Sequence, residues 1–319
     1  MSFSAIKGQD RPVEIIKTYI ENSRIEGGYL FIGPEGIGKK MTALALAQAL
    51  NCEEAKIEAC GHCASCLKIE NGQHPDVHLI SGDEAQIKIE AIRQLQKEIN
   101  LKAYEGVFKV FIIDNAHTLS AEAANCLLKI LEEPPKKSLL ILITEKPNLL
   151  FKTVISRCKI LKFLPLKREA LEGILKKDYK LDAQFAHFLA YFSEGRLGQA
   201  LKLKGAGLLA KKNNLIDKFV LGPRPDTESL ASQDKEEVRF SLNLLAAWFR
   251  DIYLLKAGLP EQEVINADRR EELRRAVDSS SFLDLELAFT NISAAISYLE
   301  KNVNTRLLLF NLGMELWKA

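Results

Sequence analysis

The chain has 319 residues, of which 47% are hydrophobic, and its 44 Lys and Arg residues against 42 Asp and Glu residues leave a net charge of +2. This length and apolar content suffice for two or three domains with buried cores, while the balanced charge gives no general electrostatic reason for nucleic-acid binding. No apolar run approaches the ~20 residues of a membrane span, and the first residues lack the apolar region of a signal peptide. We therefore expect a cytoplasmic protein.

A glycine-rich loop follows the first predicted strand, an apolar run over residues 29–32. The loop reads Gly33-Pro34-Glu35-Gly36-Ile37-Gly38-Lys39 and opens a predicted helix. Its glycines, Gly33, Gly36 and Gly38, allow backbone N–H groups to surround phosphate oxygens, and Lys39 adds a positive charge. The spacing predicts a phosphate-binding loop, although an ordinary glycine turn between a strand and a helix has the same pattern.

Lys40 occupies the position where a nucleotide-binding loop carries the Ser or Thr hydroxyl that ligates Mg²⁺. Thr42 lies roughly 200° around the helix from that position and is a poor substitute. The loop backbone can still hold ADP, phosphate or sulfate, and an empty loop is equally compatible with the pattern. We expect any bound ATP or ADP to lack productive Mg²⁺.

Four cysteines lie close together after the predicted helix: Cys52, Cys60, Cys63 and Cys66. Four thiolates at these spacings can surround one tetrahedral Zn²⁺. Neighbouring cysteines also have the C-x-x-C spacing of redox sites, and His62 or His74 could replace one ligand. We favour structural zinc because a four-thiolate site accounts for all four residues. The remaining cysteines, Cys126 and Cys158, lie in apolar sequence and are expected to be buried.

Strands and helices then alternate. The expected elements are a strand over 77–80, an amphipathic helix over 87–99, a strand over 107–114, a helix over 121–133, and strands over 139–143 and 160–163. Such alternation predicts an α/β fold with a parallel sheet flanked by helices. Asp114 ends its strand as the acidic residue of an ATPase site, but Asn115 follows it and cannot accept a proton from water. His117 is expected only to support this segment.

The strand pattern stops at Pro165, and the rest of the chain is predicted to be helical. We expect three domains, with an α/β domain over 1–164 that contains the cysteine module at 52–66, a small helical domain over 165–207 and a helical domain over 208–319. In the last domain, apolar residues recur at helical spacing over 244–255 and 307–317, which predicts core helices that could also build subunit contacts. Trp317 fits either role. The pairs Lys136-Lys137 and Lys211-Lys212 are expected on solvated faces.

Several motifs in this order resemble those of the bacterial clamp-loader AAA+ family. They are Gly8-Gln9-Asp10, the phosphate-binding loop, the cysteine cluster, Asp114-Asn115-Ala116-His117, Leu127-Leu128-Lys129-Ile130-Leu131-Glu132-Glu133-Pro134-Pro135, and Ser156-Arg157-Cys158. Asn302-Val303-Asn304 and the helix after it are also similar to the family's C-terminal domain. The resemblance implies an AAA+ P-loop domain with an inserted zinc module, a small helical lid domain and an all-α collar domain.

In the resembling family, the arginine at the position of Arg157 enters the ATP site of a neighbouring subunit as an arginine finger and stabilises charge on the transferred phosphoryl group. A surface or interface ion pair is the other role open to this arginine. The family's lid arginine, which contacts nucleotide, is replaced here by Gly198, and Arg196 lies two positions away along the helix. Three groups that respond to nucleotide are therefore missing from the chain.

The resemblance implies a subunit of the replicative DNA polymerase holoenzyme that has no ATPase activity of its own. It would act as a stator in the clamp loader, beside gamma/tau-like motor subunits and a delta-like subunit, and help to load the sliding clamp onto primed DNA through the assembled complex. One alternative is an ATP-hydrolysing gamma/tau-like motor subunit. The other is a zinc-containing DNA-binding module outside any loader.

Overall fold

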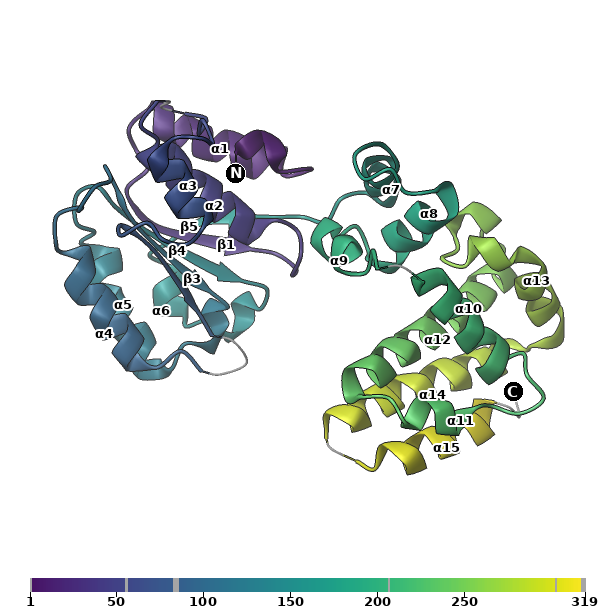
Figure 1. The fold of residues 1–319 in the computed structure, drawn as a ribbon. Helices are drawn as coiled ribbons and strands as arrows, with labels where there is room; N and C mark the ends of the chain where they lie inside the picture. Colours follow the sequence, from purple (N-terminus) through teal and green to yellow (C-terminus); the bar gives the residue numbers. More distant parts are fainter. Residues whose placement is uncertain (1, 55–56, 83–85, 206, 302, 317–319) are drawn as a thin grey trace. The chain divides into compact units, whose positions relative to one another are not determined.

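The computed structural model describes residues 2–54, 57–82, 86–205, 207–301 and 303–316. They form two compact units: the first runs to Leu166 and includes Arg196–Gln199, and the second comprises Lys167–Gly195 and the chain from Ala200 onward. The first unit is mixed α/β and the second is helical (Figure 1). The finer division into three domains stays a prediction.

The first unit is built on a five-stranded sheet. Its strands are β1 (Gly27–Ile32), β2 (Val77–Ser81), β3 (Lys109–Asp114), β4 (Ser138–Thr144) and β5 (Lys159–Lys162). They lie in the order β2-β3-β4-β1-β5, and every pairing is parallel. This sheet confirms the predicted α/β class. Because the strands are parallel, the ends of β1, β3 and β4 meet at one edge, where ligands bind in open α/β sheets.

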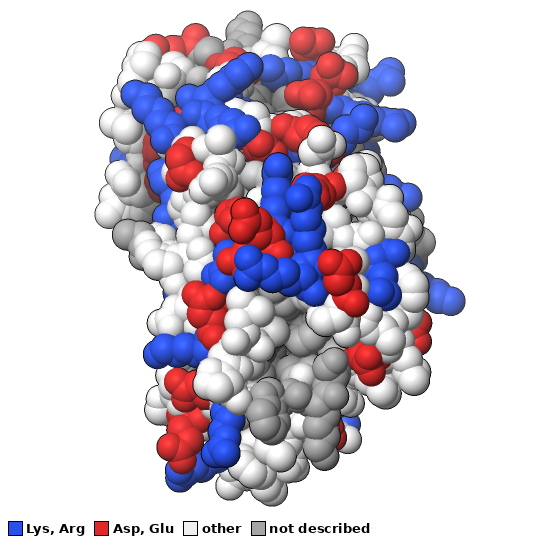
Figure 2. All heavy atoms as spheres, turned by 90° about the vertical axis from the view of Figure 1, so that its right-hand side faces the viewer, with Lys and Arg blue, Asp and Glu red and all other residues white. Residues whose placement is uncertain are grey.

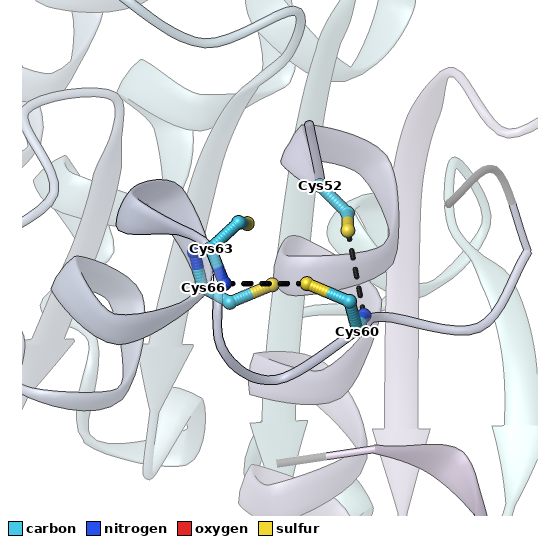
Figure 3. Close-up of side chains that lie close together, drawn as sticks. All are labelled: Cys52, Cys60, Cys63 and Cys66. Atoms are coloured by element: carbon cyan, nitrogen blue, oxygen red, sulfur yellow. Dashed lines mark hydrogen bonds between the residues drawn. The ribbon is translucent and has the colours of Figure 1, made fainter. Parts of the chain in front are cut away.

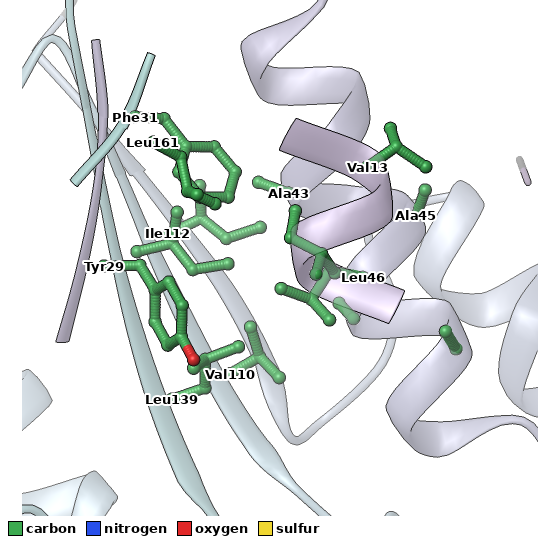
Figure 4. Packing of buried hydrophobic residues seen from close by; sticks show 14 of the residues in the cluster. Val13, Tyr29, Phe31, Ala43, Ala45, Leu46, Val110, Ile112, Leu139 and Leu161 are labelled. Atoms are coloured by element: carbon green, nitrogen blue, oxygen red, sulfur yellow. The ribbon is translucent and has the colours of Figure 1, made fainter. Parts of the chain in front are cut away.

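Helices cover both faces of this sheet (Figure 1). They are α1 (Asp10–Glu21), α2 (Lys39–Asn51), α3 (Ala64–Glu70), α4 (Ile89–Ile99), α5 (Ala121–Glu132) and α6 (Lys152–Ile155), with 3-10 turns η1 (Phe3–Ala5), η2 (Ala116–Thr118) and η3 (Pro147–Leu149). On one face, Tyr29 and Phe31 of β1 pack with Leu46 of α2 (Figure 4). On the other face, Leu30 packs with residues of α4 and α5. Burial on both faces explains why the central strands have continuous apolar sequences.

A buried carboxylate holds the loop that leads into β3. Asp76 is 0% exposed, and its carboxylate accepts hydrogen bonds from the backbone N–H groups of Tyr104, Glu105 and Gly106 at 2.8 to 3.0 Å. Its Oδ1 also lies 3.7 Å from Lys109 Nζ. Burial opposes ionisation, but the three N–H donors and Lys109 outweigh it and hold the pKa of Asp76 below its ordinary value. The ionised carboxylate thus fixes the entry to the strand that ends at Asp114.

The second unit consists of helices around a buried tryptophan. The helices are α7 (Arg168–Lys177), α8 (Ala183–Phe192), α10 (Leu208–Phe219), α11 (Thr227–Ala231), α12 (Lys235–Lys256), α13 (Arg270–Ser279), α14 (Phe282–Glu300) and α15 (Thr305–Leu316), with η4 (Glu261–Glu263) and η5 (Ala267–Arg269), while α9 (Leu197–Lys202) is divided between the two units. Trp248 of α12 is 0% exposed, and α12 packs along α14. Trp317 lies outside the described residues. In the described ranges, no helix combines the length and apolar character needed to cross a membrane.

The prediction that Lys211-Lys212 lies on a solvated face is wrong for Lys212. This side chain is 0% exposed, its Nζ lies 2.5 Å from Asp268 Oδ1, and the ammonium lies 5.1 Å from the centre of the Phe188 ring. Burial lowers the pKa of Lys212, and Asp268 opposes that shift. Elsewhere, basic and acidic side chains are interspersed over the face drawn in Figure 2, in agreement with the balanced composition.

Candidate functional site

The phosphate-binding loop lies between β1 and α2. Gly36 and Gly38 have φ angles of 77° and 100°, values that glycine adopts without the strain of a side chain. Within the described residues, the backbone N–H groups of residues 36–41 have no hydrogen-bond acceptor. They therefore remain available to an anion at the start of α2.

The loop lysine is buried and directed at the loop itself. Lys39 is 7% exposed, and its Nζ donates to the carbonyl oxygens of Gly33 at 2.5 Å and Pro34 at 2.6 Å. Burial lowers the pKa of Lys39, while Glu145, Asp114 and Glu35 oppose that shift. One of the three N–H donors of the ammonium is left for a ligand.

The carboxylate at the end of β3 is paired within the chain. Lys40 Nζ lies 3.4 Å from Asp114 Oδ2, and the backbone N–H of Asn115 donates to Asp114 Oδ1 at 3.0 Å. Both oxygens that could ligate or orient a hydrated metal therefore have a partner. The Thr42 hydroxyl donates to the carbonyl oxygen of Gly38 at 2.9 Å, so it is directed back at its own helix.

A cavity of about 670 Å³ opens beside these residues. Its lining includes Glu35, Lys39, Asp114 and His117. Burial lowers the pKa of His117, and Lys146 adds to that shift, while Nδ1 lies 3.2 Å from the Thr144 hydroxyl. The histidine thus lies at the edge of the site as a neutral polar group, with a supporting hydrogen bond to β4.

Gly198 places its backbone directly against the loop. Its N–H donates to the carbonyl oxygen of Gly36 at 2.7 Å, and a Cβ atom at Gly198 would lie 2.7 Å from the same oxygen. Real Cβ atoms do not approach backbone oxygens so closely, so this position has no room for a side chain unless the backbone shifts. The structure therefore places a backbone contact where the resembling family carries an arginine.

Arg157 lies at the surface, between α6 and β5. Its side chain is 35% exposed and its Nη2 lies 2.6 Å from Glu132 Oε1, while Nε donates to the same oxygen at 2.8 Å. On the other side of the guanidinium, Nη1 donates to the carbonyl oxygen of Thr153 at 2.9 Å and approaches the Ser156 hydroxyl at 3.5 Å. The arginine is thus ordered by its own chain and still accessible.

The four clustered cysteines converge at the end of α2 and the start of α3 (Figure 3). The Sγ atoms of Cys52, Cys60, Cys63 and Cys66 all lie within 4.8 Å of one another. Backbone N–H groups of Cys60, Cys63 and Cys66 donate to the preceding thiols in turn at 3.3 to 3.4 Å. Tetrahedral Zn²⁺ with four thiolates needs sulfur separations of about 3.8 Å. The cluster can therefore hold one metal ion and is compatible with structural zinc.

The histidines near this cluster are placed outside its four-sulfur group. His74 is buried, and its Nδ1 accepts a hydrogen bond from the Asp76 N–H at 3.1 Å, whereas His62 lies with Glu54 beside Cys60. The two other cysteines, Cys126 and Cys158, are half-buried against the apolar core. Burial raises the pKa of Cys158 to about 12.

Comparison with known proteins identifies the family. A family model described as "DNA polymerase III, delta subunit" matches residues 8–167. DNA polymerase III subunit delta-prime of Bacillus subtilis is 32% identical over 319 residues, which cover 97% of this chain and 96% of that protein. The chain belongs to this family of clamp-loader AAA+ proteins.

Other members of the clamp-loader group are also similar. DNA polymerase III subunit tau of Bacillus subtilis is 33% identical over 306 residues, which cover 86% of this chain and 54% of tau. Among solved structures, a DNA polymerase III gamma subunit-related protein from Thermotoga maritima shares 17% identity over 96% of this chain and 99% of that one, with a TM-score of 0.48. The chain thus spans nearly all of delta-prime but only about half of tau.

Two ion pairs of the candidate site, Lys40 with Asp114 and Glu132 with Arg157, cannot be identified from the sequence. The sequence predicts Asp114 as the acidic residue of a degenerate nucleotide site, but its pairing with Lys40 depends on how β3 and α2 pack in the fold. Glu132 was noted only as part of a family motif, although it is the residue that contacts Arg157. The adjacent carboxylates of Glu132 and Glu133 were a signal, but only the folded structure shows which of them faces the arginine.

Proposed function

We propose that this chain is a delta-prime-type subunit of the replicative clamp loader that does not hydrolyse ATP and donates Arg157 to the ATP site of a neighbouring motor subunit. It acts as a stator, beside gamma/tau-like motor subunits and a delta-like subunit, while the assembled complex loads the sliding clamp onto primed DNA. Such a protein works in the cytoplasm. The observation that carries this proposal is the pairing of Lys40 with Asp114, because it places a protein cation at the carboxylate that a motor would use for Mg²⁺.

Three features of the chain's own site support the absence of hydrolysis. Phosphoryl transfer needs a metal bridging the phosphates, a residue that positions water and a cation that stabilises the transition state. Here Lys40 replaces the metal-binding hydroxyl, Asn115 replaces a carboxylate base, and Gly198 contacts Gly36 through the backbone. The free N–H groups of the loop still favour an anion, so ADP or ATP bound there would lack productive Mg²⁺.

Arg157 has the properties that a finger acting in a neighbouring site requires. Guanidinium stays charged at any physiological pH and presents a planar fork that fits phosphate oxygens. Its exposure of 35% leaves it accessible to another subunit. Arginine fingers contribute about 10³ to 10⁵ in rate.

The cysteine cluster supports a structural role for zinc. Cys52, Cys60, Cys63 and Cys66 would hold the ion as four thiolates. A closed site with four protein ligands leaves no position for a substrate. Zinc would supply a crosslink between the end of α2 and the start of α3.

Reconstitution of the clamp loader with a gamma/tau-like motor subunit tests the proposed role. We expect Arg157→Ala to reduce DNA-stimulated ATP hydrolysis by about 10³-fold at its site while the complex still assembles. Arg11→Ala, an exposed arginine on α1, is the matched control and should leave the rate unchanged. An unchanged rate with Arg157→Ala would show that Arg157 does not act as an arginine finger.

The motor alternative is tested on the isolated chain. We expect no ATP turnover above background, and turnover that Lys39→Ala abolishes would instead establish a motor. Tight, salt-dependent binding of primed DNA by the isolated chain would favour the DNA-binding alternative.

A further inference from the structure

We infer that Glu132 is a positioning residue for Arg157 and sets the direction of the guanidinium before a neighbouring ATP site is engaged. This inference rests on the proposed finger role of Arg157. A single oxygen, Glu132 Oε1, lies 2.8 Å from Nε and 2.6 Å from Nη2. The carboxylate therefore occupies the side of the guanidinium that includes Nε.

The other contacts of Arg157 hold the opposite side. Nη1 donates to the carbonyl oxygen of Thr153 at 2.9 Å, and the Ser156 hydroxyl is at 3.5 Å, the outer limit of a hydrogen bond. An arginine has five N–H donors. Nη2 keeps one donor, and Nη1 keeps one whose only described neighbour is the distant Ser156 hydroxyl. These two donors suffice for a fork against phosphate oxygens.

Glu132 and Thr153 belong to helices that pack against each other. Glu132 is the last residue of α5, Thr153 lies in α6, and α5 contacts α6. The guanidinium is consequently bound to two rigid elements rather than to a loop. An arginine held in this way loses less side-chain freedom when it meets its target than a freely rotating one.

Glu132 adds to the function of the finger rather than competing with phosphate for it. A competing carboxylate would have to be displaced before the arginine could act. Here the remaining donors of Nη1 and Nη2 are left for the ligand, so a phosphate can bind while the contact to Glu132 persists. The pair is partly exposed, at 35% and 50% of the two side chains, so its contribution to fold stability is small and its effect should appear in the reaction.

The experiment uses the reconstituted clamp loader and steady-state ATP hydrolysis at saturating primed DNA. We expect Glu132→Gln to lower kcat at the neighbouring ATP site by about tenfold while KM for ATP changes by less than about twofold, because a misdirected group lowers reactivity without changing ATP binding by the motor. Glu133→Gln is the matched control. It changes the adjacent exposed carboxylate, which has no ion pair within the described residues, and should leave kcat unchanged.

A double variant separates positioning from a structural role. Since Glu132 acts through Arg157, Glu132→Gln combined with Arg157→Ala should be no slower than Arg157→Ala alone. An unchanged or raised kcat with Glu132→Gln, or an additive loss in the double variant, would overturn the positioning role while the finger stands. If Arg157→Ala itself has no effect, the proposed function fails first. The two failures are therefore distinguishable.

Discussion

Lys40 Nζ and Asp114 Oδ2 lie 3.4 Å apart, so a cation belonging to the chain stands beside the carboxylate at the end of β3. In an ATPase of this architecture, that carboxylate helps to hold Mg²⁺. The ammonium satisfies the charge of Asp114 without a metal. Lysine at residue 40 therefore has two effects on a Mg²⁺ site. It replaces the hydroxyl ligand, and its ammonium pairs with Asp114, the other ligand.

Lys40→Thr should partly restore metal-dependent nucleotide binding. The change releases Asp114 and supplies the missing hydroxyl, so we expect Mg²⁺ to strengthen ADP binding by at least about tenfold, the factor that about 1.4 kcal/mol produces. Calorimetric titration with ADP, in Mg²⁺ and in EDTA, measures the effect. ATP hydrolysis should stay at background because Asn115 is not a base.

Lys40→Ala is the control for this prediction. It releases Asp114 without adding a hydroxyl, and its gain in Mg²⁺ dependence should be smaller than that of Lys40→Thr. If the unmodified chain already shows the Mg²⁺ dependence of Lys40→Thr, then Lys40 does not take the place of the metal.

Gly198→Ala should destabilise the first unit. The added Cβ would lie 2.7 Å from the Gly36 carbonyl oxygen, and overpacking of this kind costs about 1–3 kcal/mol. Gly173 of α7 has nothing within 4 Å of its Cβ position, so Gly173→Ala should instead stabilise its helix by up to about 1 kcal/mol. Urea unfolding measures both changes. Equal stabilisation by the two substitutions would show that the backbone around Gly36 and Gly198 shifts to admit the added Cβ at little cost in free energy.

Removal of zinc should destabilise the protein. We expect about one Zn²⁺ per chain, bound by four thiolates, and a lower Tm after chelation because the ion crosslinks two helices. Cys66→Ser should lose the metal, whereas Cys126→Ser, which changes a cysteine outside the cluster, should retain it. A disulfide between clustered cysteines in metal-free native protein would establish the redox alternative.

Asp76→Asn should change how stability depends on pH. The folded pKa of Asp76 lies below its unfolded value, so ionised Asp76 stabilises the fold above about pH 3.9, and this contribution is lost as the pH falls through the folded pKa. At pH 7, we expect the substitution to cost about 2–3 kcal/mol, because a charged acceptor of three N–H groups is replaced.

Urea unfolding at pH 7 and near pH 3 checks this dependence. The difference in the free energy of unfolding between the unmodified chain and Asp76→Asn should become smaller at the lower pH. Glu21→Gln, at the exposed end of α1, is the control and should show no such narrowing. A difference that is independent of pH would mean that the pKa of Asp76 is the same in the folded and unfolded protein, contrary to this prediction.

The strands and most helices of the first unit could be predicted because their signals are local. The residues at which these strands and helices begin depend instead on contacts with residues far away in the sequence. Residues 107 and 108 have an apolar sequence that predicts strand, yet their N–H groups both donate to Asn51 Oδ1 at 2.8 Å, and β3 begins at Lys109. Ile87 belongs to the predicted helix over 87–99, but in the structure it lies before α4 and forms an isolated parallel bridge with Leu119.

The candidate site likewise has features that local sequence predicts and contacts that depend on tertiary packing. The convergence of the cysteines follows from their spacing in one short segment, which the sequence displays directly. The pairs Lys40 with Asp114 and Glu132 with Arg157 join different elements, and so does the burial of Lys212 against Asp268. Nothing in the order of residues distinguishes these charges from solvated ones, because only tertiary packing determines which of them meet.

The contact between Gly36 and Gly198 restricts how this chain can evolve. A Cβ at Gly198 would meet the carbonyl oxygen of Gly36, and a Cβ at Gly36 would lie 2.9 Å from the backbone nitrogen of Gln199. Neither position tolerates a larger residue while the other segment stays in place. An arginine at residue 198 would therefore require the loop or the start of α9 to move, so the packing of the two backbones opposes its return.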